Sequence, residues 1–159
     1  MTPPLAAIET LPLAVALRDS APLHAAVATV HLVGVALLVG SVAMIDLRLL
    51  GLSRALPVRR LAAHVLPWTA ASFLLIVPSG LLMFLARAGE LVGSPLFALK
   101  MLLILAGGTN AALFHAATFR GVAAWDTQAM PPAAARLAAA LSLVVWLSVL
   151  ACGRLLAKA

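Results

Sequence analysis

The stretch from His24 to Leu52 limits the possible folds more than any other part of the chain. It is mostly apolar, and it is longer than the roughly 20 residues that an α-helix needs to cross the hydrocarbon core of a bilayer. It also contains two histidines and ends in the polar triplet Asp46-Leu47-Arg48. Polar side chains are costly in a helix that faces only lipid, so we expect this helix to have polar partners or a ligand.

Three further apolar runs follow, and the predicted spans are about 23–47, 67–86, 95–119 and 133–154. With 64% apolar and 10% charged residues, the chain of 159 residues lacks the polar surface of a soluble domain. The sequence therefore predicts one all-α domain over residues 1–159, an integral membrane four-helix bundle. The segment from Leu5 to Arg18 is too short to span, and we expect it to form short helices at the membrane interface.

Two features are expected to shape the second span. Pro67 and Trp68 predict its start, with Trp68 at the depth of the membrane interface. The triplet Pro78-Ser79-Gly80 lies inside the span and predicts a kink, beside which a freed carbonyl finds a partner.

The net charge of +6 does not indicate nucleic acid, because the cations flank apolar runs, where they meet lipid head groups. The first and third connections carry six Lys and Arg residues, and the opposite side carries five. The dense run Arg54, Arg59, Arg60 favours the cytoplasm for the first connection. We therefore expect a bacterial inner-membrane protein with both termini in the periplasm.

Histidine is rare in membrane spans, because its ring nitrogens need partners there. His31 and His115 lie inside apolar runs, and each shares a helix face with a glycine, Gly34 and Gly108 respectively. A buried imidazole beside the space left by a glycine suits an axial ligand of haem b. Arg48 and Lys100 are candidates to pair with haem propionates, although Lys100 one turn inside its span is also expected to snorkel outward.

The depths of these histidines limit how they pair. His31 and His115 are expected in opposite leaflets, so His64 with His115 is the better pair within one chain. For His31 the candidate partners are Met101, Met83 or a residue of a symmetry-related chain. A purely structural alternative is equally open for His31 and His115, in which each ring only hydrogen-bonds within the bundle.

Several stretches resemble a family of uncharacterised bacterial four-helix inner-membrane proteins: residues 31–52 with their DLRLLG piece, 95–100, 110–115 and Gly153-Arg154. That family is similar, more distantly, to CopD-type copper-resistance proteins and to four-helix b-type cytochromes. The resemblance implies that His31 and His115 are the positions to watch. It implies no activity.

These observations leave three hypotheses. The first is a b-type cytochrome-like subunit that carries electrons between quinone and a periplasmic redox partner, as a homo-oligomer or as part of a larger complex. The second is copper handling at the periplasmic side by His24, His31 and nearby methionines. The third is a non-catalytic membrane scaffold. The chain lacks the common catalytic motifs, so an accessory or electron-transfer role is favoured over a stand-alone enzyme.

Overall fold

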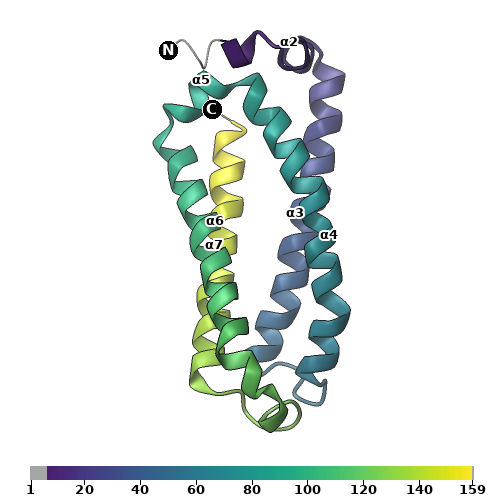
Figure 1. The fold of residues 1–159 in the computed structure, drawn as a ribbon, viewed down its shortest axis with the longest axis vertical. Helices are drawn as coiled ribbons and strands as arrows, with labels where there is room; N and C mark the ends of the chain where they lie inside the picture. Colours follow the sequence, from purple (N-terminus) through teal and green to yellow (C-terminus); the bar gives the residue numbers. More distant parts are fainter. Residues whose placement is uncertain (1–6, 159) are drawn as a thin grey trace.

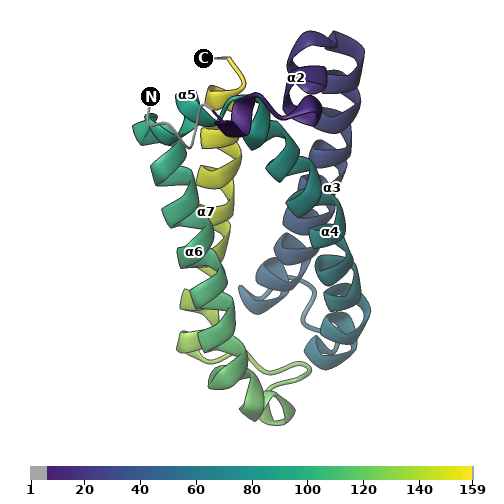
Figure 2. The ribbon, with the colours of Figure 1, turned by 45° about the horizontal axis from the view of Figure 1, so that its top comes forward.

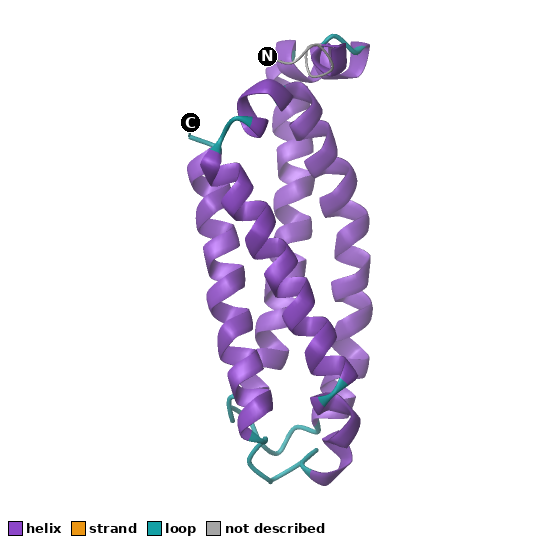
Figure 3. Cartoon of the chain, turned by 60° about the vertical axis from the view of Figure 1, so that its left-hand side comes forward, coloured by secondary structure: helices purple, strands orange, loops and turns teal. Residues whose placement is uncertain are grey.

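The computed structural model describes residues 7–158, and this part of the chain is helical throughout apart from its turns. Four long helices run up and down the molecule (Figures 1 and 3). Their bounds are Ala21–Leu49 for α3, Val58–Ala86 for α4, Pro95–Ala116 for α6 and Ala133–Leu156 for α7. The predicted all-α four-helix architecture is confirmed.

Three short helices flank or connect the long ones. They are α2 (Pro12–Asp19), α5 (Ala88–Val92) and the 3-10 helix η1 (Thr118–Ala124). The helix α2 lies across the end of the α3–α4 pair (Figure 2), and it buries Ala14 and Leu17 while Leu13 stays exposed. This arrangement matches the expected interfacial segment, of which residues 5 and 6 lie outside the described range.

The second long helix begins earlier than the sequence predicts. We expected its start at Pro67 and Trp68, but α4 begins at Val58 and continues through both of its prolines. Its first turn is capped from a distant loop, because the backbone N–H groups of Val58 and Arg59 donate to the carbonyl and carboxyl oxygens of Asp126. The third span is also shorter than expected, because α6 ends at Ala116 and η1 follows.

The bundle consists of two helical hairpins. The pair α3–α4 and the pair α6–α7 each pack closely, and α3 joins the two by packing on α7. The backbones of α4 and α6 do not pack along their length (Figure 1), although Phe84 and Phe97 stack between them at 5.7 Å. A central cluster joins side chains from all four helices, among them Leu38, Ile76 and Trp146.

Glycine sets the closeness of the first hairpin. A Cβ at Gly34 would lie 2.8 Å from Ile76 Cγ1 and 2.9 Å from Leu75 Cβ, so α3 and α4 approach at a distance that only glycine permits. A Cβ at Gly107 of α6 would lie 3.3 Å from Cζ2 of Trp146 on α7, so this contact is also close.

The outer faces of the long helices are apolar. Many large apolar side chains are exposed there, such as Leu74 at 77% and Leu105 at 67%. All four helices are long and apolar enough to cross a membrane. Burying such surface in water-free surroundings is favourable, which explains the excess of apolar residues in this composition.

Candidate functional site

His31 lies at the α3–α4 interface, and α4 holds its ring. The Nδ1 atom is 3.0 Å from the hydroxyl oxygen of Ser79 and 3.2 Å from the carbonyl oxygen of Ile76. A Cβ at Gly80 would lie 3.0 Å from Cε1 of the ring, so a larger residue there would displace the imidazole. The segment from Ile76 to Gly80 therefore holds this histidine in place. That the carbonyl freed by Pro78 finds a partner stays a prediction.

The hydrogen bonds at Nδ1 decide which nitrogen of the neutral ring carries the proton. The carbonyl of Ile76 can only accept, and the Ser79 hydroxyl donates its own proton to the carbonyl of Leu75. Nδ1 of His31 must therefore donate, and Nε2 keeps its lone pair. Within residues 7–158, no group donates a hydrogen bond to that lone pair.

Lys100 is the candidate cation on α6. Its side chain is half-buried, and its Nζ lies 3.9 Å from the position that a Cβ on Gly153 of α7 would occupy. That this side chain snorkels outward to the head groups stays a prediction.

The candidate groups therefore include the bare Nε2 of His31 and the ammonium group of Lys100. The two ion pairs among the described residues, Arg18–Asp19 and Arg87–Glu90, do not involve Lys100. An anion or a carbonyl oxygen would be favourable beside that ammonium group, since apolar surroundings strengthen charge-assisted hydrogen bonds.

His115 lies in the opposite half of the bundle. It is 15 residues after Lys100 on α6, which corresponds to about 22 Å along a helix. Its Nδ1 is 2.8 Å from the carbonyl of Ala111, so Nε2 is again the bare nitrogen. The ring is exposed on the outer face of α6 and contacts Phe114 and Phe119, each at 5.3 Å.

The two glycines predicted to make room for haem have different surroundings. The space beside Gly34 is occupied by side chains of α4, as described above. Gly108 has no atom within 4 Å of the position its Cβ would occupy, and it lies on the exposed face of α6 that also carries His115. Space for a flat ligand is therefore beside Gly108, outside the bundle, and not beside Gly34.

The remaining candidates are spread over the bundle. His64 is exposed on the second turn of α4, and Met101 is 48% exposed on α6. His24 and Met83 are half-buried. Met83 is four residues after Ser79 and His24 is seven before His31, so the helical repeat puts all four on facing sides of α3 and α4.

Arg48 joins the two connections at the other end of the bundle. Its side chain is 2% exposed. Nε donates to the carbonyl of Leu56 at 2.7 Å, and Nη2 donates to the carbonyls of Arg54 and Asp126 at 3.1 and 3.0 Å. We call this arrangement the Arg48 clamp. That the same guanidinium also meets a haem propionate stays a prediction.

Sequence reasoning missed the partners in this clamp. Asp126 is not marked by any motif, yet its carbonyl accepts from Arg48 and its carboxyl caps α4. Asp46 is 6% exposed, and its Oδ2 has no hydrogen-bond partner among the described residues. The only signal was the unusual Asp-Leu-Arg triplet at the end of an apolar run.

Four apolar helices with apolar outer faces define a multi-pass helical membrane protein. The chain belongs to DUF6644, a family of unknown function, whose family model matches residues 20–159. No curated protein matches the chain, and no solved structure does. The predicted membership of an uncharacterised family is confirmed, and the activity has to be proposed from the residues themselves.

Proposed function

We propose that this protein is a b-type cytochrome-like membrane subunit that carries electrons through a bound haem, with His31 as an axial ligand. The observation that supports this is the imidazole whose Nδ1–H is held by Ile76 and Ser79 while Nε2 keeps a free lone pair. Histidines that bind metals are usually held in this way, with one ring nitrogen hydrogen-bonded to the protein and the other bound to the metal.

Two further features fit haem b. The ammonium group of Lys100 has no acidic partner among the described residues and suits a propionate. The second axial ligand is open to Met83, to Met101 or to a residue of a second protomer. His115 also has a free Nε2, but on the outer face of α6, so it would hold iron only together with a ligand from another molecule. Pairing with His64 would need the ends of α4 and α6 to move toward each other.

The proposed setting follows from the sequence. Electrons would pass between quinone and a periplasmic redox protein, with the protein in the bacterial inner membrane and both termini in the periplasm. A homo-oligomer, or assembly into a larger complex, would supply a missing ligand. The more distant likeness to b-type cytochromes and CopD-type proteins stays a prediction.

A visible spectrum of protein expressed with ample haem tests the proposal. We expect a Soret band that is lost in His31→Asn, because the asparagine amide keeps a donor near the Nδ1 position but offers no nitrogen at Nε2. His24→Asn is the matched control, since His24 lies on the same helix and has no part in the haem proposal. A wild-type protein that folds without any Soret band would refute haem binding, and a band that survives His31→Asn would refute the assignment.

The second candidate function is copper handling. It is favoured by the shared face of α3 and α4 that carries His24, His31 and Met83, since imidazole and thioether groups suit Cu(I). Metal analysis of the purified protein decides between the two. Bound copper that falls in Met83→Leu, without any haem spectrum, would favour this candidate, and a protein free of both would leave the scaffold role.

A further inference from the structure

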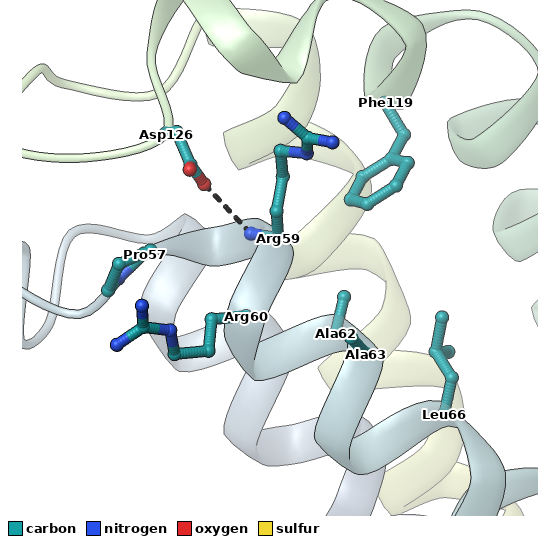
Figure 4. Close-up of a pocket in the computed structure, with 8 residues that line it drawn as sticks. All are labelled: Pro57, Arg59, Arg60, Ala62, Ala63, Leu66, Phe119 and Asp126. Atoms are coloured by element: carbon teal, nitrogen blue, oxygen red, sulfur yellow. Dashed lines mark hydrogen bonds between the residues drawn. The ribbon is translucent and has the colours of Figure 1, made fainter.

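An open pocket of about 630 Å³ lies at the beginning of α4, beside η1 and the loop that follows it. Its wall contains two arginines, Arg59 and Arg60, and one acid, Asp126 (Figure 4). The other lining residues are apolar: Pro57, Ala62, Ala63, Leu66 and Phe119. The pocket is thus charged on one side and apolar on the other.

The guanidinium groups in this pocket are available for an anion. Both arginines are exposed, and neither takes part in the two ion pairs among the described residues. The carboxyl of Asp126 already accepts from the backbone N–H of Arg59 at 2.8 Å, which partly satisfies its charge. The first turn of α4 adds the positive end of a helix of 29 residues.

The depth of the pocket matches the boundary between head groups and hydrocarbon. A helix of 29 residues is about 43 Å long, which exceeds the roughly 30 Å of hydrocarbon by more than two turns. The predicted apolar span begins near Pro67, so the turns that carry Arg59 and Arg60 lie at head-group level. Leu66 lies where acyl chains begin.

We propose that this pocket binds an anionic phospholipid, with the phosphate on Arg59 and Arg60 and an acyl chain along Ala63, Leu66 and Phe119. A free phosphate ion would use the guanidinium groups but gain nothing from the apolar wall. A zwitterionic lipid would use the wall but be attracted less by two cations. The combination of both surfaces at this depth favours a lipid that is anionic and carries acyl chains.

The experiment measures phosphatidylglycerol retained by the full-length protein in detergent, by native mass spectrometry with added lipid. The double variant Arg59→Gln, Arg60→Gln is compared with Arg120→Gln, Arg136→Gln, which removes the same charge from exposed residues outside the pocket. We expect binding to weaken about tenfold or more in the first variant, since each charge-assisted hydrogen bond is worth roughly a factor of ten. The control should change less than threefold.

Two further measurements separate the sources of the phosphate. Leu66→Ala should weaken phosphatidylglycerol binding about threefold or more while both arginines remain, since it removes apolar contact with an acyl chain. Phosphatidylcholine should bind at least tenfold more weakly than phosphatidylglycerol. Equal loss in the two arginine variants, equal binding of the two lipids, or full displacement by millimolar inorganic phosphate would each overturn the proposal.

Discussion

Replacing Arg48 by alanine should destabilise the protein more than replacing any exposed arginine, because the buried Arg48 clamp joins both connections at one end of the bundle. Three of its hydrogen bonds end on backbone carbonyls, those of Arg54, Leu56 and Asp126. The first two carbonyls lie in the connection between α3 and α4, and the third lies in the connection that leads to α7.

The size of the effect follows from these contacts. A hydrogen bond with a charged donor contributes about 1.5–3 kcal/mol, so three contribute about 5–9 kcal/mol in favour of the folded state. The Nη1 atom of Arg48 is buried without a partner among the described residues, which costs about 1–3 kcal/mol. The difference between these two contributions is about 2–8 kcal/mol. We therefore expect Arg48→Ala to lower the free energy of unfolding by about 3–5 kcal/mol, the range seen when one partner of a buried charged contact is removed.

Reversible unfolding in mixed micelles, followed by tryptophan fluorescence, measures this change. Trp125 is a suitable probe, because it is 8% exposed and precedes Asp126 in the chain. Arg54→Ala is the matched control: it removes an exposed side chain from the same connection but keeps the carbonyl that Arg48 uses, so we expect a change within about 0.5 kcal/mol. Arg48→Lys should fall between the two, since an ammonium group does not reproduce the guanidinium fork. If both alanine variants unfold alike, the clamp does not stabilise the fold as argued.

Two more predictions use contacts elsewhere in the bundle. Gly34→Ala should lower the free energy of unfolding by about 1–3 kcal/mol, because its Cβ would come within 2.9 Å of two α4 side chains. Gly108→Ala should be neutral or stabilising by up to about 1 kcal/mol, since no atom lies near the position of its Cβ. The same micelle titration measures both changes, and equal effects would contradict the packing argument. Asp126→Ala should lower the free energy of unfolding by about 1 kcal/mol, because it removes the carboxyl group that caps the N–H of Arg59. The backbone carbonyl of residue 126 stays available to Arg48. Hydrogen exchange of the Arg59 amide should become faster, and unchanged exchange would mean that the cap is not formed.

The sequence predicted the parts of this structure that depend on local composition. Four apolar runs of spanning length predict four helices whatever their neighbours are, because backbone groups in lipid must be paired within the segment. The helix α6 begins at Pro95, where the third span was predicted to begin, because a serine cap followed by proline acts within one turn.

The parts that failed depend on contacts between distant residues. The helix α4 begins nine residues before the predicted span, and its first turn is capped by Asp126, 67 positions away from Arg59. The two glycines beside histidines also looked alike in sequence, yet Gly34 is closed by α4 and Gly108 is open. Periodicity gives the face of a helix but not which neighbour, if any, covers that face.

A purely structural role would need only one of the two ring nitrogens of His31. Its Nδ1–H donates to the carbonyl of Ile76, and an asparagine could do as much with a smaller side chain. The imidazole adds a second polar atom, and the half-buried ammonium group of Lys100 has no acidic partner among the described residues. Both groups lower the stability of an apolar bundle unless a polar partner meets them, by about 1–3 kcal/mol for each group left unsatisfied. If His31→Asn proves as stable as the wild type and changes no bound cofactor, the second nitrogen has no ligand and the site must be reinterpreted as packing.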